Sequence, residues 1–253
     1  MTETALALSA RGLSKSYGAL QVTQDVSFDV AAGAALGIIG PNGAGKTTLF
    51  NLIAGTVRAG AGTVTLFGRD VTRLDARRRC LAGVGRSFQV PQPFSGMTVF
   101  ENLLIAAAFG RSLSERAARA AAEEALTSTG LAPRAGLLAG QLTLLDRKRL
   151  ELARALATGP RLLLLDEIAG GMTEAECGAL IDLIRDIHRS GVTIVWIEHV
   201  LHALLSVVDR VLVLDFGKVI AEGPADTILS DPQVAAIYLG PGEQGSGEEV
   251  AHA

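Results

Sequence analysis

The sequence predicts an α/β fold with a parallel β-sheet, an antiparallel β subdomain and an inserted helical lobe. In the second half of the chain, short apolar runs bounded by glycine or charge alternate with an amphipathic helical stretch. This order is typical of a parallel sheet with helices on its faces. Near the N-terminus, apolar and polar residues alternate between tight turns, as in antiparallel strands. An alanine-rich, charge-rich stretch between these regions predicts the helical lobe.

The expected elements of the first third follow in chain order from these patterns. Residues 6–18, 22–30 and 62–71 alternate in the manner of antiparallel strands. Between the second and the third of these segments, the apolar run ALGIIG at 35–40 predicts a buried strand. The apolar stretch TTLFNLIAG at 47–55 follows it and predicts a helix.

The helical lobe is expected from about residue 91 to residue 150. Within it, SERAARAAAEEALTSTG at 114–130 is rich in alanine and charged residues, has few β-branched residues and predicts a helix. We expect residues 1–240 to form a single domain that contains this lobe as an insertion. The polar, glycine-rich residues 241–253 predict a disordered tail.

Three further buried strands and a helix are expected after the lobe. LLLLD (162–166), TIVWIE (193–198) and RVLVLD (210–215) are short apolar runs, and 174–191 has apolar residues at helical spacing with a glycine at its end. Strand, helix and strand in this order predict a parallel pairing.

The composition limits the class of protein. A chain of 253 residues with 49% apolar residues is long enough for one large globular domain. The formal charge of −3 argues against nucleic acid as the main partner. Cys80 and Cys177 form no CxxC pair and are expected to be free thiols. The best candidates for a membrane helix, 103–110 and 192–197, are far shorter than the roughly 20 residues that one needs. The N-terminus lacks the basic region that marks a signal peptide. We therefore expect a soluble, cytoplasmic protein. Docking on a membrane protein remains open.

The clearest chemical motif is GPNGAGKTT, which matches GxxxxGK[ST] between the predicted strand 35–40 and the predicted helix 47–55. Backbone N–H groups of such a loop surround phosphate oxygens at the positive end of a helix. Lys46 is expected to reach the β- and γ-phosphates, and the Thr47 hydroxyl to ligate Mg²⁺. A chance glycine turn is the alternative, which the flanking strand and helix disfavour. The predicted nucleotide-contacting residues are Gly40, Pro41, Asn42, Gly43, Ala44, Gly45, Lys46, Thr47 and Thr48.

A second candidate group stands at the end of the leucine-rich strand 162–166. Asp166 ends this strand at the sheet edge where ligands bind, and is expected to hold Mg²⁺ through water. Glu167 follows it and is placed to polarise an attacking water. Two solvated acids at a strand end are the alternative, which the phosphate loop in the same chain makes less favourable.

Over residues 6–240, the chain resembles the nucleotide-binding subunit of an ABC transporter. The resemblance rests on SKSYGAL, GPNGAGKTT, RSFQ, LLLLDE and WIEHV, which occur in the family's order. It implies an ABC ATPase domain with a RecA-like P-loop NTPase core, an antiparallel β subdomain and a helical lobe. It also implies ATP and Mg²⁺ as ligands, and a site on the cytoplasmic face of the inner membrane.

The same resemblance implies a role for each matching side chain. Tyr17 corresponds to the aromatic residue that stacks on adenine. Gln89 corresponds to the glutamine that contacts the metal and the attacking water and relays the ATP state to the membrane domains. Glu167 stands in the position of the catalytic base, and His199 in that of the histidine that contacts the γ-phosphate.

Within the family, residues 86–107 and 231–240 resemble cassettes of branched-chain amino acid importers. The implied partners are membrane-spanning permease subunits, a second ABC ATPase subunit and, indirectly, an external solute-binding protein. Cassettes of lipopolysaccharide export are close relatives, and a catalytically silent regulatory subunit is a further alternative. An ABC protein of DNA repair or translation is disfavoured, because the chain has neither a second cassette nor a long coiled-coil insertion.

The segment LTLLD at 142–146 departs from the signature LSGGQ of the family, which contacts the γ-phosphate of ATP on the opposite subunit. Thr143 keeps the hydroxyl, whereas Leu144 and Leu145 replace glycines and restrict close backbone approach. Asp146 replaces glutamine and is expected to disfavour a nearby triphosphate. A helix capping box formed by Thr143 and Asp146 is an alternative interpretation.

A second departure follows Glu167. Ile168 replaces the family's proline, and Thr173 replaces the aspartate that lines the dimer interface. The departures therefore concern the elements that face another subunit, while residues that serve the chain's own ATP match. This asymmetry predicts pairing with a different ATPase, although LTLLD as a working variant remains open. The arginines of 73–80 are expected on a solvated face, with contact to a membrane protein as the alternative.

Overall fold

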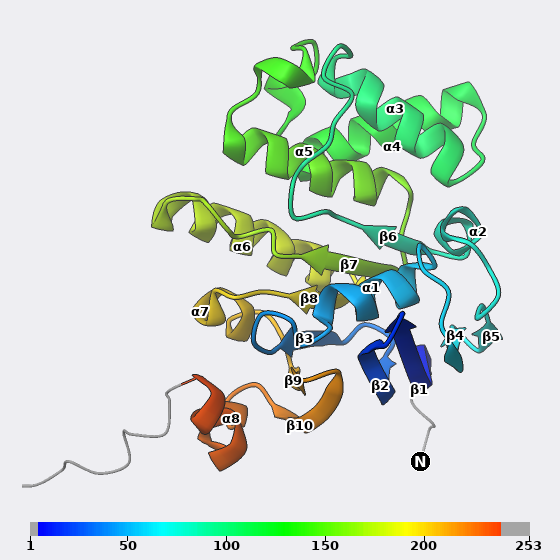
Figure 1. Ribbon diagram of the computed structural model, residues 1–253. Coiled ribbons are helices and arrows are strands. Elements are labelled where there is room, and N and C mark those ends of the chain that lie inside the picture. The colour runs from blue at the N-terminus through cyan, green and yellow to red at the C-terminus, as the bar shows by residue number, and fades with distance from the viewer. Residues whose placement is uncertain (1–4, 239–253) are drawn as a thin grey trace, which may run out of the picture.

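The computed structural model describes residues 5–238, which form two β-sheets surrounded by helices (Figure 1). The larger sheet has six strands in the order β10-β9-β3-β8-β7-β6. Neighbouring strands from β9 to β6 are parallel, and β10 runs antiparallel to β9. Its strands are β3 (Ala35–Ile39), β6 (Val84–Arg86), β7 (Leu162–Asp166), β8 (Thr193–Ile197), β9 (Arg210–Asp215) and β10 (Lys218–Pro224).

The smaller sheet is antiparallel and has the order β2-β1-β4-β5. Its strands are β1 (Leu6–Tyr17), β2 (Leu20–Ala31), β4 (Ala61–Leu66) and β5 (Arg69–Asp70). Together with α1 (Lys46–Ala54) it covers one face of the larger sheet. Leu36 and Ile38 of β3 pack on that side, in one cluster with Leu8 of β1 and Phe50 of α1.

Helices cover the opposite face of the six-stranded sheet. Ala35 and Ile39, the other residues of β3, pack there in a cluster with Trp196 and Ile184. This alternation is the two-residue period of a strand buried on both faces. The helices of this layer are the second half of α5 (Leu144–Ala157), α6 (Glu174–Arg189) and α7 (Leu201–Leu205), followed along the chain by a 3-10 turn (Ile228–Ser230) and α8 (Pro232–Tyr238).

The helical lobe stands at one end of the molecule, between β6 and β7 in the chain (Figure 1). It consists of α3 (Val99–Gly110), α4 (Glu115–Ser128) and the first part of α5, with 3-10 turns at Ala132–Arg134 and Ala139–Gln141. Its own apolar cluster includes Leu103, Ala118, Ala122 and Leu150, all fully buried. The antiparallel subdomain and the inserted helical lobe are therefore confirmed.

One expectation about charge is wrong. Arg79, in α2 (Ala76–Leu81), is buried at 3% exposure, although the arginines around it lie on a solvated face. Its guanidinium donates to the carbonyls of Leu52, Ile53, Thr72 and Leu74. Carbonyls at the end of a helix such as α1 have no partner within the helix, so a buried cation there satisfies them.

Two further expectations concern the ends of the chain and the membrane. The predicted tail 241–253 lies outside the described residues. Within residues 5–238, no helix has both the length and the apolar character needed to cross a membrane.

Candidate active site

The glycine loop at residues 40–45 lies between β3 and α1, pressed against two other segments. A Cβ atom at Gly40 would collide with the carbonyl oxygen of Leu214, at the end of β9. Gly45 has a φ of 97°, and a Cβ atom there would lie 2.5 Å from the carbonyl oxygen of Val22 in β2. Only glycine meets both the left-handed conformation and the close approach. The loop therefore joins the two sheets at the N-terminus of α1.

Lys46, the first residue of α1, points back into this loop. Its Nζ donates to the carbonyl of Gly40 at 2.7 Å and to that of Pro41 at 3.0 Å. Burial lowers the pKa of Lys46, while the carboxylates of Glu167 and Asp166 raise it. The ammonium is thus held inside the loop, facing the two acids, where it is placed to neutralise the charge of a phosphate.

The other predicted ligand-binding residues surround the loop. Thr47 is exposed and Thr48 is half-buried at the start of α1. Tyr17 is 49% exposed and pairs with Leu20 at the turn between β1 and β2, two residues before Val22 reaches the loop. An aromatic ring is therefore exposed at the end of the hairpin whose strand β2 reaches the phosphate loop through Val22.

Three predicted catalytic residues from separate segments meet at the carboxylate of Glu167. Gln89 Nε2 donates to Oε2 at 2.6 Å, and His199 Nε2 lies 2.8 Å from Oε1. Glu167 directly follows β7 and His199 follows β8 by two residues, so the parallel pairing brings both loops to one sheet edge. Glu167 also has a left-handed φ of 46°, which is uncommon for a residue other than glycine.

Asp166 has a partner that the sequence did not reveal. Its Oδ2 accepts from the guanidinium of Arg86 at 2.8 Å, and the same guanidinium donates to Asn51 Oδ1 at 2.7 Å. Burial raises the pKa of Asp166, and the hydrogen bond from Arg86 lowers it. Arg86 belongs to the motif RSFQ, and its strand β6 pairs in parallel with β7. This pairing, which no local sequence pattern indicated, places Arg86 near the end of β7.

The donor set suits Mg²⁺. Thr47, Asp166 and Gln89 supply hydroxyl, carboxylate and amide oxygens at the phosphate loop. Among residues 5–238 no group of three or more histidine, cysteine or acidic residues is gathered as for a metal. Oxygen ligands of these kinds are the type that Mg²⁺ takes, together with waters and phosphate oxygens.

The segment LTLLD begins α5, and its aspartate points inward. Thr143 caps the helix, accepting from the N–H of Asp146 at 3.2 Å. The Asp146 carboxylate is only 3% exposed and is paired with Arg134 at 2.6 Å and with Arg149 at 3.7 Å. Of the capping box that was the alternative interpretation, only the Thr143 half forms, and the Asp146 carboxylate pairs with the arginines instead. The expectation that the Asp146 carboxylate repels a triphosphate is thus wrong, because that carboxylate is buried and paired with arginines. Leu144, in contrast, is 44% exposed at the helix start.

The departures after Glu167 have roles within this chain. Ile168 is buried in the cluster beneath the larger sheet. Thr173 caps α6 in a reciprocal capping box with Glu176. Both residues therefore stabilise their own segment, whatever they meet on another subunit.

The strand β3, its glycine loop and α1, with the inward-pointing lysine facing an acidic strand end, define a P-loop NTPase fold. Comparisons with known proteins narrow this class. Residues 23–170 match the family described as ABC transporter, and the chain belongs to this family as an ATP-binding cassette. Residues 218–240 also match the family described as branched-chain amino acid ATP-binding cassette transporter.

Related sequences cover nearly the whole chain. A probable ABC transporter ATP-binding protein of Azorhizobium caulinodans is 37% identical over 239 residues, 92% of this chain and 83% of the relative. The high-affinity branched-chain amino acid transport ATP-binding protein LivG of Salmonella typhimurium is 36% identical over 250 residues, 92% of this chain and 97% of the relative. The lipopolysaccharide export system ATP-binding protein LptB of Haemophilus influenzae is 33% identical over 233 residues, 92% and 97% of the two chains.

Solved structures confirm the fold. An ATP-binding cassette of an ABC transporter in its ADP conformation superposes with a TM-score of 0.83 at 31% identity, covering 94% of this chain and all of that one. A nucleotide-free ATP-binding cassette gives 0.84 at 30% identity, covering 92% and 98%. Members of this family bind nucleotide and work with membrane permease components. The predicted P-loop core is thus confirmed together with the family.

Proposed function

We propose that this cassette hydrolyses ATP to drive the import of a small solute, most closely branched-chain amino acids or related compounds. The observation that carries the proposal is the carboxylate of Glu167, held between Gln89 and His199 beside the phosphate loop. The match of residues 218–240 and the similarity to LivG support the substrate class. The similarity to LptB supports lipopolysaccharide export as the second candidate.

In the proposed reaction, water attacks the γ-phosphate in line with the leaving oxygen. Glu167 accepts the proton of that water, and Gln89 and His199 orient the carboxylate and the phosphate. Lys46 neutralises phosphate charge from within the loop, and Tyr17 stacks on adenine. Mg²⁺, held by Thr47, Asp166 and Gln89, would supply further charge neutralisation. Residues 1–240 act as one ATPase domain in this proposal, with the lobe 91–150 inserted.

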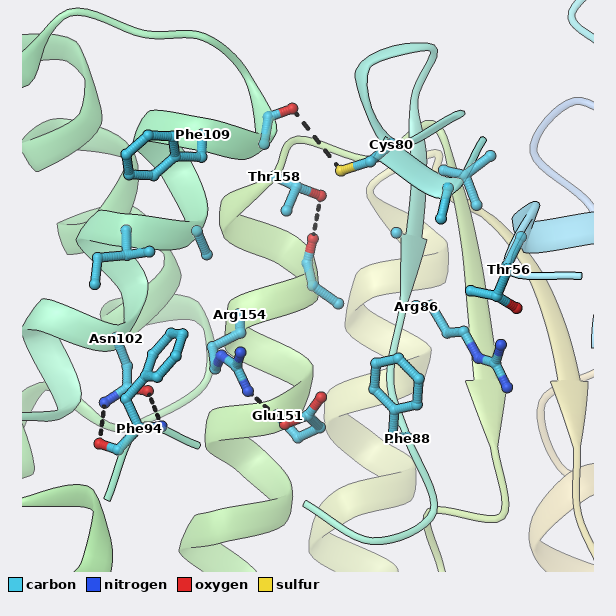
Figure 2. Close-up of a pocket in the computed structure, with 18 residues that line it drawn as sticks. Thr56, Cys80, Arg86, Phe88, Phe94, Asn102, Phe109, Glu151, Arg154 and Thr158 are labelled. Atoms are coloured by element: carbon cyan, nitrogen blue, oxygen red, sulfur yellow. Dashed lines mark hydrogen bonds and ion pairs between the residues drawn. The ribbon is translucent and has the colours of Figure 1, made fainter. Parts of the chain in front are cut away.

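A surface groove is the proposed docking site for the permease. It has a volume of about 340 Å³ and lies between β6, α2 and the lobe helices α3 and α5. The exposed rings of Phe88, Phe94 and Phe109 line it, together with the ion pair of Glu151 and Arg154 (Figure 2). Because Phe88 directly precedes Gln89, a movement of Gln89 would shift a permease segment bound in the groove. This docking places the cassette on the cytoplasmic face of the inner membrane, with an external solute-binding protein on the other side.

We also propose that the second cassette is a different chain. Leu144, exposed at the start of α5, presents a side chain where close backbone approach to a partner's phosphate needs glycine. This chain's ATP would be hydrolysed with the partner's signature, and the partner's ATP would turn over slowly opposite LTLLD.

Hydrolysis is tested with Lys46→Ala and Glu167→Gln in the complex with permease and partner cassette. In the purified chain, without the partner cassette, Lys46→Ala is expected to abolish Mg-ATP binding, measured by fluorescent nucleotide titration. Glu167→Gln should keep binding and lower the hydrolysis rate roughly 10²–10⁴-fold, because it removes the general base. Hydrolysis unchanged in Glu167→Gln, or absent from the wild type, would support a silent subunit.

The asymmetry is tested by moving the same glutamate-to-glutamine change from this chain to the partner. Transport should stop with Glu167→Gln and continue with the partner variant. Replacing Leu144 and Leu145 by glycine should raise turnover of the partner's ATP. Equal losses from both glutamate variants would show two working sites.

The substrate is tested with the reconstituted complex and its solute-binding protein. Branched-chain amino acids should stimulate ATP hydrolysis and accumulate in proteoliposomes. Stimulation by lipopolysaccharide in place of amino acids would support export.

A further inference from the structure

The peptide unit between Ile168 and Ala169 is held from both sides by buried charged side chains. Its carbonyl, on Ile168, accepts from Lys148 Nζ at 2.7 Å. Its N–H, on Ala169, donates to Glu198 Oε2 at 2.9 Å. A cation on the oxygen and an anion on the N–H match the peptide dipole, so this unit has one strongly favoured orientation.

Both side chains are almost completely enclosed. Lys148 is 6% exposed and Glu198 is 2% exposed. Burial lowers the pKa of Lys148, and the charge of Glu198 acts in the opposite direction. Apolar residues of similar volume often stabilise a protein at least as well as buried charged groups, so stability alone does not account for these two side chains.

Glu198 joins the two catalytic loops. Its second oxygen, Oε1, accepts from the N–H of His199 at 2.9 Å and from that of Val200 at 3.3 Å. One carboxylate thus holds the loop after β7, through Ala169, and the loop after β8, through His199. These two loops carry the side chains that meet at 2.8 Å, Glu167 Oε1 and His199 Nε2.

Glu167 needs such support because its backbone is left-handed, with a φ of 46°. A non-glycine residue stays in that region only when its surroundings enforce it. The N–H of Glu167 donates to the carbonyl of Ile197 at 2.9 Å. The peptide held by Lys148 and Glu198 begins at Ile168, the residue after Glu167. Lys148 lies on α5, the helix that begins at Thr143 and passes from the lobe to the core.

We propose that Lys148 and Glu198 are positioning residues for hydrolysis. By fixing the Ile168–Ala169 peptide they hold Glu167 against His199, in an orientation set by helix α5. A shift of α5, whose first turn faces another subunit in the proposed dimer, would change the placement of the catalytic glutamate in the same chain. The inference rests on the proposed function, since positioning requires that Glu167 acts on ATP.

The variants Lys148→Met and Glu198→Gln, singly and together, test the proposal in the full chain assembled with its permease and partner cassette. We expect kcat to fall about 10–100-fold, because a small misplacement of a catalytic group costs rates of this order. Nucleotide affinity should stay within about threefold, because neither residue touches the phosphate loop. The double variant should lose little more than either single one, since both act on one peptide unit. Lys148→Arg should recover most of the rate.

Arg79→Met is the matched control. It also removes a buried cation from backbone carbonyls, but from those of Leu52 and Ile53 at the C-terminal end of α1. It is expected to lower the melting temperature without a selective loss of kcat. If Lys148→Met lowers kcat only in proportion to its loss of stability, as this control does, and Lys148→Arg gives no recovery, a positioning role is excluded. Variants with a wild-type kcat would exclude it as well.

Amide hydrogen exchange of the purified chain separates this inference from the proposed function. The amides of Ala169 and His199 should exchange faster in Glu198→Gln and Lys148→Met than in the wild type, with no change at Leu103 in the lobe. If the wild-type complex hydrolyses no ATP, the proposed function fails, and exchange alone then decides whether the peptide is clamped. Unchanged exchange at both amides would overturn the clamp.

Discussion

At the scale of single residues, Arg86 governs the surroundings of Asp166. The guanidinium and the carboxylate are 9% and 7% exposed, so neither charge is well solvated. Arg86 also bonds Asn51 of the phosphate-loop helix and lies 4.9 Å over the ring of Phe88 in the groove. One side chain therefore links the predicted metal-binding acid, α1 and the proposed docking surface.

Arg86→Met is expected to lower the free energy of unfolding by about 3–5 kcal/mol, because it leaves a buried carboxylate without its cation. Urea unfolding measures this loss. Mg-ATP should reduce the difference in free energy of unfolding between the variant and the wild type, because it brings a cation to Asp166. Arg119→Met, which breaks the exposed pair with Glu115, should cost no more than about 0.5 kcal/mol. Equal losses in the two variants would show that the buried pair has no special importance.

At the scale of elements, side chains at the helix starts define where the helices begin. Thr98 with Glu101 and Thr173 with Glu176 form reciprocal capping boxes at α3 and α6. At α5, Thr143 makes one half of this arrangement. Asp146 instead pairs with Arg134, from the 3-10 turn Ala132–Arg134. The start of α5 is thus fixed by charge as well as by capping.

Thr173→Ala is expected to lower the free energy of unfolding by about 1 kcal/mol, through loss of the cap of α6. Chemical unfolding measures it, with Thr127→Ala, a threonine in the last turn of α4 and not at a helix start, as the comparison. A loss no larger than in that comparison would contradict a capping role.

The same capping box predicts a pH dependence. Hydrogen bonds from the N–H and hydroxyl of Thr173 lower the pKa of Glu176 in the folded state. The stability from Glu176 is therefore present above its unfolded-state pKa and is lost as the pH falls through the lower folded-state pKa. Melting temperatures of the wild type and Glu176→Gln should differ at pH 7 and converge in acid. Glu123→Gln, an exposed substitution in α4, is the control. Its difference in melting temperature from the wild type should not shrink in acid in this way.

At the scale of the whole molecule, the groove and the active site adjoin at Arg86, the last residue of β6, which lines the groove and donates to Asp166. Phe88, Phe94 and Phe109 are 46%, 48% and 75% exposed, which leaves a cluster of rings open between core and lobe. The side-chain amide of Asn102 holds the backbone of Phe94: its Oδ1 accepts from the Phe94 N–H, and its Nδ2 donates to the Phe94 carbonyl. The backbone of Phe94 is thus fixed, and the exposed rings offer a surface that suits an apolar segment of a permease.

Phe94→Glu is expected to abolish co-purification with the permease subunits and to leave Mg-ATP binding unchanged, because the ring lies in the groove and not at the phosphate loop. Leu137→Glu is the control, since Leu137 has a similar exposure of 46% in the same lobe but does not line the groove. Retained co-purification in Phe94→Glu would move the docking surface elsewhere.

The sequence by itself determined the elements and the candidate residues that depend on local pattern. The glycine loop, the leucine-rich strand before Asp166 and the helix of 174–189 follow from spacing that is visible along the chain. The roles of Gln89 and His199 came from resemblance, and their meeting at Glu167 followed only once parallel strands had brought their loops together.

Only the tertiary structure decided the partners of the buried charges. Arg79, Arg86, Lys148 and Glu198 look like ordinary surface residues in the sequence, yet each is enclosed or nearly so with hydrogen bonds to distant segments. The inward turn of Asp146 was hidden for the same reason. Local pattern records whether a residue suits a helix or a strand, whereas the burial of a charge depends on which segments pack over it, and this information lies far away in the chain.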